Sequence, residues 1–580
     1  MCGIIGYIGK ENPKDILING LKKLEYRGYD SAGIALKGKE LEVIKSIGKI
    51  SNLEDKINNT NIIDSNIGIA HTRWATHGEP SEINAHPHTI GKITLVHNGI
   101  IENAKELKNI LEEKGVKFNT STDTEVIAAL IDYYYEGNTK EAIEKAIKEL
   151  KGSYALAIIN KDEDKLYAVR CESPLILGIG DSEYFVTSDI GAILPYTKKY
   201  VLLGKDEIVT MTKDSYVIEK EDTKVYRKEE ISTLSVEDTD LNGYDHYMMK
   251  EINEEPVLID SFIKNHIDKL DEWLDISKYK NIHIVGCGSA YYAGMIGRYL
   301  FEDDGIKVDV DVASEYRYRN IIYDKDTLVI LISQSGETAD TIAAMRKANE
   351  NGVDTLAIVN VESSTIERES TYSILLEAGK EIAVATTKAF VLQVLILSLL
   401  SYKLNKDNKY IEDIRKLPQQ LKVLLDKTGF YKKLADSIYK HEDVFFIGRK
   451  VDYAISLEGS LKLKEISYIH SDSYQAGELK HGTISLVKDG TIVFAIVTDD
   501  SIRDKTISNL EEMISRGAKP IYVGNSDVDY ENKIIIPKIH PKLQPILAVA
   551  PLQIIAYFVA LKRGCDIDKP KNLAKSVTVE

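Results

Sequence analysis

Cysteine is scarce in this chain of 580 residues, which contains only Cys2, Cys171, Cys287 and Cys565. None of the four belongs to a Cys-x-x-Cys pair, and this argues against both a disulfide framework and a thiolate zinc site. We therefore expect free thiols in a reducing cytoplasm. The sequence also predicts no metal site and no bound cofactor.

Long apolar runs and an excess of basic residues are missing as well. The two most apolar runs, residues 389–402 and 546–561, fall short of the ~20 residues that span a bilayer and are interpreted as buried helices. No basic region followed by an apolar stretch is visible at the N-terminus, so neither a signal peptide nor a membrane association is predicted. The net charge of −16 argues against a nucleic-acid partner, because phosphate-binding surfaces need clustered Lys and Arg.

The most informative residue that is present stands at position 2. If the initiator Met1 is removed, Cys2 carries both a thiol and a free α-amine. An α-amine with an unperturbed pKa near ~8 can accept the thiol proton, so one residue would supply both nucleophile and base. The alternative is a small apolar residue in a first strand.

The chain changes character near residue 240. Residues 1–218 show short apolar strands, for example 93–97 and 154–160, with a few helices, which is typical of a layered α+β domain. Residues 219–245 are mostly polar and charged, with little periodicity, and are predicted to form a linker.

The second half of the chain repeats itself. Apolar strands followed by helices recur at a nearly constant offset, and each copy closes with an apolar helix that carries Leu-Gln. The paired segments are 282–288 with 444–450, 328–333 with 491–497, 352–360 with 517–525, and Gln393 with Gln553. Strands alternating with helices imply parallel sheets covered on both faces. The fold class is thus α/β and α+β multidomain, with two doubly wound domains at residues 246–412 and 413–580.

Two strand ends in the first repeat carry suitable chemistry for a ligand. The segment Gly286-Cys287-Gly288-Ser289 lacks the third glycine of a dinucleotide fingerprint, since Tyr291 stands at that position, and this argues against a nicotinamide site. The other end, residues 333–338, packs three hydroxyls and an amide at the start of a predicted helix that runs to about Glu350. Such a helix start can cradle a phosphate, although an ordinary Ser/Thr helix cap is the alternative.

Longer motifs carry a resemblance to a known family over essentially the whole chain. They are MCGIIGYIG at the start, LEYRGYDSAG (24–33), HTRWATHGEPSEINAHPH (71–88), HNGIIEN (97–103), STDTEV (121–126), SQSGETADT (333–341), EIAVATTKAF (381–390), LKLKEISYIH (461–470), AGELKHG (476–482) and NLAKSVTVE (572–580). The chain resembles the glutamine:fructose-6-phosphate amidotransferases. This resemblance implies an N-terminal-nucleophile glutaminase followed by two sugar isomerase domains. It also implies the first committed step of amino-sugar synthesis, from fructose 6-phosphate and glutamine to glucosamine 6-phosphate and glutamate.

In the glutaminase half, the resemblance makes Cys2 the nucleophile that attacks the glutamine amide. Oxyanion stabilisation falls to Asn98 and the Gly99 amide in a predicted HNG turn, although Asn-Gly is also a common hairpin signal. The implied substrate-binding residues are Arg73 for the α-carboxylate, Asp123 for the α-ammonium, and Trp74 and His77 beside them.

In the isomerase half, the resemblance assigns each step of the sugar chemistry to a residue. Lys575 forms a Schiff base, Glu465 shuttles a proton with Lys462 tuning it, and His481 opens the sugar ring from the other subunit of a homodimer. Read alone, Glu465 would be an exposed glutamate on an amphipathic helix. The implied sugar and phosphate contacts are Ser289, Ser333, Gln334, Ser335 and Thr338, with Val384 and Ala574 acting through backbone atoms. The family often has Thr after Cys-Gly, where this chain has Ser289.

Two rival functions remain open from the sequence. One is another amidotransferase or a fructosamine-phosphate deglycase, although a deglycase would lack the Cys2 half. The other is a sugar-phosphate sensor without catalysis, although mere binding requires no imine-forming Lys575.

Overall fold

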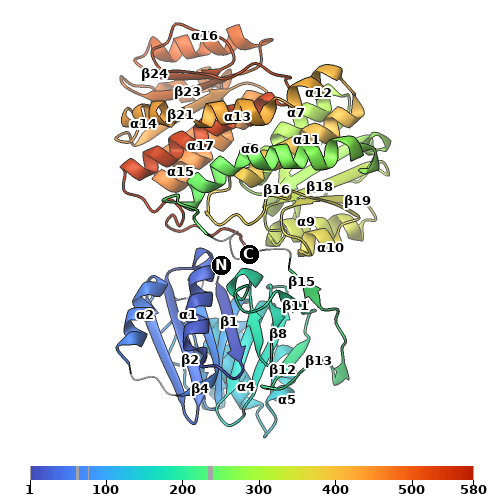
Figure 1. Ribbon diagram of the computed structural model, residues 1–580, viewed down its shortest axis with the longest axis vertical. Helices are drawn as coiled ribbons and strands as arrows, with labels where there is room; N and C mark the ends of the chain where they lie inside the picture. The colour runs from blue at the N-terminus through green and yellow to red at the C-terminus, as the bar shows by residue number, and fades with distance from the viewer. Residues whose placement is uncertain (1, 61–63, 76–77, 233–239, 579–580) are drawn as a thin grey trace. The chain divides into compact units, whose positions relative to one another are not determined.

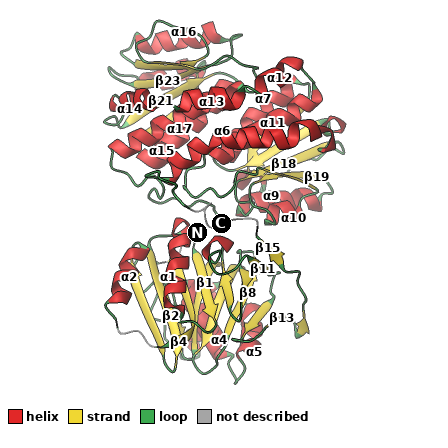
Figure 2. Cartoon of the chain, in the orientation of Figure 1, coloured by secondary structure: helices red, strands yellow, loops and turns green. Residues whose placement is uncertain are grey.

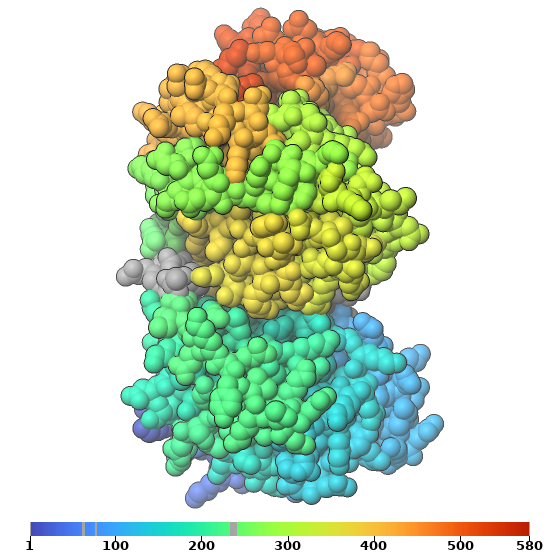
Figure 3. All heavy atoms as spheres, turned by 90° about the vertical axis from the view of Figure 1, so that its right-hand side faces the viewer, coloured from blue at the N-terminus to red at the C-terminus, as the bar shows by residue number. Residues whose placement is uncertain are grey.

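The computed structural model describes residues 2–60, 64–75, 78–232 and 240–578. The chain divides into two compact units, which are coloured along the sequence in Figure 1. The first unit spans residues 1–240 together with the tail from Ala574, and the second spans Leu241–Leu573. Figure 3 draws the heavy atoms as spheres and shows one outer face of each unit, in the same sequence colours.

Two antiparallel sheets form the centre of the first unit. Within the described residues, one sheet has the order β15 (Glu230–Ile231), β11 (Lys199–Leu202), β9 (Ile176–Ile179), β10 (Tyr184–Thr187), β1 (Gly3–Ile8), β4 (Ser65–Arg73), β2 (Ser31–Gly38) and β3 (Leu41–Ile47). The other has the order β14 (Thr223–Lys224), β13 (Tyr216–Lys220), β12 (Ile208–Met211), β8 (Leu166–Cys171), β7 (Gly152–Asn160), β6 (Ile93–Ile101) and β5 (His88–Ile90). Their facing apolar side chains make one core.

Helices cover the outer face of each sheet of the first unit. A second apolar core lies under α1 (Pro13–Leu24) and α2 (Ile50–Asn58). A third lies under α3 (Ala104–Glu113), α4 (Asp123–Tyr133) and α5 (Thr139–Ile147). Because both faces of each sheet are covered, strands such as β1 are buried along their whole length. The predicted layered α+β fold is confirmed.

The segment for which a linker is predicted contributes strands to this unit. The end of β13 pairs with β14, and β15 pairs with β11. The exposed Arg227 also forms an ion pair with Glu207, whose side chain is buried. Edge strands are held by backbone hydrogen bonds and tolerate charged side chains, so they need not show an apolar pattern.

The second unit contains two five-stranded parallel sheets within the described residues (Figure 2). The first has the order β17 (Lys307–Val312), β16 (Asn281–Gly286), β18 (Thr327–Ser333), β19 (Asp354–Val359) and β20 (Tyr372–Leu375). The second has the order β22 (His470–Gln475), β21 (Asp443–Gly448), β23 (Ile492–Val497), β24 (Lys519–Gly524) and β25 (Lys533–Ile535). The matching strand orders confirm the predicted repeat. In each sheet the order reverses between the first and third strands, and ligands of doubly wound folds bind at that point.

Helices pack on both faces of these sheets. They are α6 (Tyr247–His266), α7 (Ser289–Asp303), α8 (Ala313–Tyr316), α9 (Ala339–Glu350), α10 (Thr365–Glu369), α11 (Lys388–Leu404), α12 (Asn408–Ile414), α13 (Leu417–Leu425), α14 (Thr428–Asp436), α15 (Val451–Ser467), α16 (Arg503–Ile514) and α17 (Gln544–Lys562). One apolar core joins both repeats, and the predicted domain boundary at residues 412 and 413 falls inside α12.

The two most apolar helices lie inside this core. α17 is long and apolar enough to cross a membrane by length and composition, but 89% of its most apolar window is buried inside the protein. α11 is buried along most of its length. Both helices match the predicted buried helices, and their apolar residues are the shared core of the two repeats.

A carboxylic acid is buried in the same core. The Glu255 side chain on α6 is 1% exposed and lies near the amide of Gln553 on α17. Burial raises the pKa of Glu255 well above its ordinary value, and Gln553 and Lys388 only partly oppose this effect. One turn earlier on α6, Glu251 is also buried, but it accepts hydrogen bonds from the backbone N–H groups of Ile382 and Ala383.

We expect Glu255→Gln to raise the melting temperature, and the gain to grow as the pH rises from 5 to 8.5. A carboxyl group whose folded pKa is raised keeps its proton when the unfolded chain has lost it. Its contribution to stability is therefore full below the ordinary pKa of 4.5 and is lost as the pH rises. The matched control Glu251→Gln should lower the melting temperature. It weakens two backbone hydrogen bonds, which should reduce the free energy of unfolding by about 1–3 kcal/mol. An equal, pH-independent loss in both variants would contradict this assignment.

Candidate functional site

Cys2 lies immediately before β1, beside the end of the neighbouring strand β4. The Trp74 backbone N–H donates to the Cys2 Sγ over 3.2 Å. Burial raises the pKa of the Cys2 thiol, Arg73 lowers it and Asp123 raises it. The three residues thus lie within electrostatic range of one another, and a thiol with a raised pKa needs a base before it can attack a substrate.

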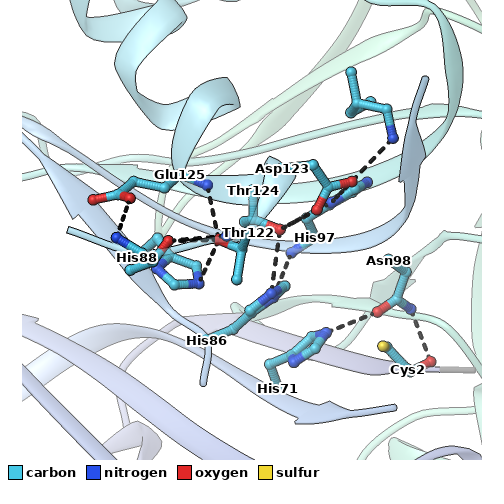
Figure 4. Close-up of polar contacts among 12 residues, drawn as sticks. Cys2, His71, His86, His88, His97, Asn98, Thr122, Asp123, Thr124 and Glu125 are labelled. Atoms are coloured by element: carbon cyan, nitrogen blue, oxygen red, sulfur yellow. Dashed lines mark hydrogen bonds and ion pairs between the residues drawn. The ribbon is translucent and has the colours of Figure 1, made fainter. Parts of the chain in front are cut away.

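The Asn98 amide lies beside Cys2 (Figure 4). Its Nδ2 donates to the Cys2 carbonyl oxygen over 3.0 Å and to the Ser188 Oγ over 2.9 Å. Its Oδ1 lies 3.0 Å from the His71 Nε2. Every polar atom of this amide therefore has a hydrogen-bond partner, and two of its three partners are side chains of other strands or of their ends.

The HNG segment lies inside β6 and not in the predicted turn. Asn98 pairs with Ala155 and Gly99 with Tyr154, both in the neighbouring strand β7. Gly99 takes part in this strand pairing with a backbone φ of 140°. A Cβ atom added there would come within 2.0 Å of the Ser153 carbonyl oxygen. Only glycine fits this position without a shift of the backbone.

The other predicted glutaminase residues surround this strand end. Arg73, the last residue of β4, is 3% exposed and donates to the Gly78 carbonyl oxygen over 3.0 Å. Asp123 opens α4, is 6% exposed and accepts from the Ile101 N–H over 3.0 Å. Trp74 is half-buried and meets the ring of Tyr29 edge-on. His77 lies outside the described residues.

Four further histidines of this motif region are buried next to the site, and the sequence interpretation assigned them no role. They are His71, His86, His88 and His97 (Figure 4). Five of the twelve histidines of the chain stand between residues 71 and 97, and this density is the signal that could have revealed them.

In the second unit, the predicted phosphate loop follows β18 at the reversal point of the first sheet. The Ser333 Oγ lies 3.0 Å from the Thr338 Oγ1 and accepts from the Gly336 N–H over 3.1 Å. Thr338 is the N-cap of α9, but its side chain makes no capping hydrogen bond. Its hydroxyl contacts Ser333 at the strand end, unlike that of an ordinary Ser/Thr cap.

A buried ionic cluster lies on α15, in the second repeat. On α15, the Lys462 side chain is 1% exposed and forms ion pairs with Glu465 and with Glu458, the latter at 3.4 Å. Ser289, the first residue of α7, accepts from the Lys462 Nζ over 3.1 Å and donates to the Glu458 Oε1 over 3.1 Å. The cluster therefore joins the two repeats, and its contacts with Ser289 differ from the predicted phosphate contact of that residue.

The charges of this cluster depend on its burial. Burial raises the pKa of Glu458 to about 7, and Lys462 only partly opposes this rise. For Lys462, burial alone would lower the pKa, but Glu458 and Glu465 outweigh it and the pKa rises. Lys462 is thus a cation, and Glu458 gains or loses its proton near neutral pH. Sequence reasoning missed Glu458, although it stands four residues before Lys462 on the same helix face.

In the second repeat, the side chain of Asp452 lies at the equivalent strand end. Gly288 and Lys450 precede α7 and α15 with nearly the same backbone angles, φ 55° and 52° with ψ −128° in both. In the second repeat, however, Asp452 accepts hydrogen bonds from the Thr498 N–H and hydroxyl and from the Asp499 N–H after β23. Burial raises the pKa of Asp452 to about 7. Its carboxyl group already occupies the donors that a phosphate would need, which disfavours a phosphate at this second position.

The remaining predicted residues lie in separate places. The Val384 N–H donates to the Asp568 carbonyl oxygen over 3.0 Å, so only its carbonyl remains for a ligand. His481 is exposed on a short 3-10 segment after β22. Ala574 and Lys575 belong to the tail, which the structure groups with the first unit and not with the isomerase domain to which the predicted boundary assigns it. The tail contains no helix or strand among its described residues.

Comparisons with known proteins agree with this architecture. A glutamine amidotransferase domain model matches residues 71–195, and a SIS domain model matches residues 275–402 and 437–563. Proteins named glutamine–fructose-6-phosphate aminotransferase (isomerizing) from Clostridium tetani and Methanosarcina acetivorans are 48% and 43% identical to the chain, over all of both chains in each case. The chain belongs to this family.

Solved structures support the fold of the second unit. A C-terminal domain of glucosamine-fructose-6-phosphate aminotransferase from Francisella tularensis is 34% identical, with a TM-score of 0.53, and covers 57% of this chain and 100% of its own. A tagatose-6-phosphate ketose/aldose isomerase from Escherichia coli shares the fold at 18% identity, with a TM-score of 0.50 over 57% of this chain and 96% of its own. Among the described residues, no group of His, Cys, Asp and Glu has the arrangement of a metal site.

We expect Glu458→Gln to slow the formation of glucosamine 6-phosphate from fructose 6-phosphate roughly tenfold when ammonia replaces glutamine as the nitrogen donor. Between pH 6 and 8, the ratio of variant to wild-type rates should change as Glu458 titrates near 7, and it should be level on either side. Comparing both proteins at the same pH and ammonia concentration cancels the ionisation of ammonia itself. Asp472→Asn, which alters an exposed partner of Lys464, is the control and should give a level ratio. A level ratio for Glu458→Gln would show that Glu458 does not titrate in this range.

Proposed function

We propose that the chain converts fructose 6-phosphate and glutamine to glucosamine 6-phosphate and glutamate. This is the first committed step of amino-sugar synthesis. The observation that carries the proposal is the presence, in one chain of this family, of a partly buried Cys2–Asn98 site and a sugar isomerase unit with the buried Lys462 cluster. A sensor of sugar phosphates would need neither a thiol nucleophile nor a buried proton-carrying cluster.

The glutaminase half releases ammonia through a covalent intermediate. After removal of Met1, the α-amine of Cys2 takes the thiol proton, and Sγ attacks the amide carbon of glutamine. Ammonia leaves with the transferred proton, and water hydrolyses the thioester to glutamate. The free amine is the base that the raised thiol pKa requires.

Two donors stabilise the tetrahedral oxyanion of this step, the Asn98 Nδ2 and the Gly99 N–H. One such donor typically lowers the activation free energy by about 3 kcal/mol. Because both N–H bonds of Asn98 are occupied, the oxyanion has to replace the Cys2 carbonyl or Ser188 as an acceptor. Arg73 binds the α-carboxylate of glutamine and Asp123 its α-ammonium, with Trp74 and His77 beside them.

In the sugar half, the hydroxyls of the loop after β18 bind the phosphate. Ser333, Gln334, Ser335 and Thr338 surround the start of α9, where unpaired N–H groups favour an anion. Ser289 has a different task, since it contacts Lys462 and Glu458. It holds these groups in the orientation that the proton transfer needs.

The sugar chemistry then proceeds by way of an imine. His481 opens the ring, Lys575 condenses with the C2 carbonyl and releases water, and ammonia displaces Lys575 from the imine. Glu465 next moves a proton from C1 to C2, and the C1 hydroxyl gives its proton to the imine nitrogen, which leaves an amine at C2 and an aldehyde at C1. Lys462 forms an ion pair with Glu465 and holds its carboxyl group in position. Val384 and Ala574 contact the sugar through their backbones.

The exposed position of His481 supports a homodimer in which this residue completes the site of the partner. The four free cysteines support a cytoplasmic location. No metal or cofactor takes part, and neither nucleic acid nor a membrane is a partner of a chain with net charge −16.

We expect Cys2→Ala to abolish glutamine-dependent synthesis of glucosamine 6-phosphate and to leave ammonia-dependent synthesis within about twofold of wild type. The variant removes only the thiol nucleophile, so the sugar half keeps its own chemistry. The measurement is product formation with each nitrogen donor in turn. Loss of both activities in a folded variant would contradict the division of labour between the two halves.

A further inference from the structure

We infer that His71 is a positioning residue that orients the Asn98 amide for oxyanion binding. The inference rests on the proposed role of Asn98 and extends it to a residue that would not touch the substrate. The observation that carries it is a hydrogen-bonded chain from the partly buried Cys2 through Asn98 to His71, both of which are buried (Figure 4).

The orientation of the Asn98 amide follows from its partners. The Cys2 carbonyl oxygen can only accept a hydrogen bond, so the amide atom 3.0 Å away must be Nδ2. Oδ1 then points to the other side, and the His71 Nε2, 3.0 Å from it, must carry the hydrogen. Because burial lowers the pKa of His71 to about 3, the ring is neutral, with Nε2 as its one donor.

His71 is itself held in place by a second histidine. The rings of His71 and His86 are stacked, with centroids 4.0 Å apart and planes 20° apart. The His86 Nδ1 accepts from the His97 N–H over 3.3 Å, so its Nε2 donates to the Thr124 Oγ1 at 3.2 Å. Burial lowers the pKa of His86 well below its ordinary value, so two neutral rings stack without repulsion.

The amide would lose its preferred orientation without the His71 donor. A half-turn about the last bond of the side chain exchanges Oδ1 and Nδ2, and the shapes of the two orientations are nearly identical. With His71 present, the flipped amide would set Oδ1 against the Cys2 carbonyl, and it would leave the Nε2–H of His71 without its acceptor. Without His71, the buried Oδ1 has no partner in the present orientation and only the Cys2 carbonyl opposes the flip, so part of the population flips and presents an oxygen to the developing oxyanion.

Substitutions of His71 separate the hydrogen bond from the packing. His71→Phe keeps an aromatic ring against His86 but has no donor, whereas His71→Gln places an amide N–H near the position of Nε2. We expect His71→Phe to lower the kcat for glutamine hydrolysis at least about tenfold with little change in KM, and His71→Gln to restore most of it. Ammonia-dependent synthesis should be unchanged in both variants.

A double-mutant cycle with Asn98→Ala tests the mechanism. If His71 acts through Asn98, His71→Phe should have almost no further effect on kcat in the Asn98→Ala background. The matched control is His88→Phe, which removes another buried histidine, one that contacts Thr122 and not Asn98. In the double variant with Asn98→Ala, the fold-decrease in kcat should equal the product of the fold-decreases in the two single variants.

The possible results are distinguishable. If Asn98→Ala leaves glutamine hydrolysis intact, the proposed oxyanion role fails, and the inference about His71 fails with it. If Asn98→Ala is impaired but His71→Phe is not, or if the two effects multiply, only the inference about His71 is overturned. Failure of His71→Gln to restore kcat in a variant with wild-type melting temperature would also overturn it.

Discussion

The ion pairs of Lys462 are the interaction on which the sugar unit depends. Lys462 contacts Glu458 and Glu465 on its own helix and Ser289 from the other repeat. Removing an ammonium group and two carboxyl groups from water costs several kcal/mol per ion, and only mutual pairing with well-placed hydrogen bonds offsets this cost. The two repeats therefore have to meet in one register at this point. Their shared apolar core permits close packing, but the charges select the arrangement in which α7 faces α15.

The glutaminase half solves a related problem with neutral groups. Asn98, His71 and His86 are all buried, and burial keeps both imidazoles neutral. A network of neutral donors and acceptors has no cost of ionic desolvation. Every donor must nevertheless face an acceptor, because a single flipped amide would exchange a donor for an acceptor in the network. The proposed thioester reaction needs this kind of environment, since the negative charge on the substrate oxygen develops only in the transition state. The sugar half needs a different one, because a proton has to be taken up and returned.

Much of the architecture could be predicted from the sequence. The repeat of apolar strands predicted both parallel sheets, because a strand buried on both faces leaves a continuous apolar signature. Strands such as β14 and β15 were missed, since edge pairing depends on backbone groups that every residue has. The HNG segment looked like a turn because Asn-Gly is common in hairpins, whereas here Gly99 is needed for its close approach to Ser153.

The candidate site was predicted unevenly for a similar reason. Motifs pointed to residues of known chemistry, such as Cys2 and Glu465. Glu458 and His71 were missed because their importance comes from burial and from one neighbour across the fold. In the sequence, Glu458 is one of many helical glutamates, and only its position against Ser289 distinguishes it from a solvated one. Pairings between distant segments cannot be derived from local periodicity.

The central claim is that the amide nitrogen of glutamine becomes the amine of the sugar. The most direct test supplies wild-type protein with fructose 6-phosphate, glutamine labelled with ¹⁵N in the amide, and an equal concentration of unlabelled ammonium. Mass spectrometry then gives the isotope content of glucosamine 6-phosphate, beside the amount of glutamate formed. The account predicts one labelled product for each glutamate. Glutamate formation without any labelled amino sugar would contradict it.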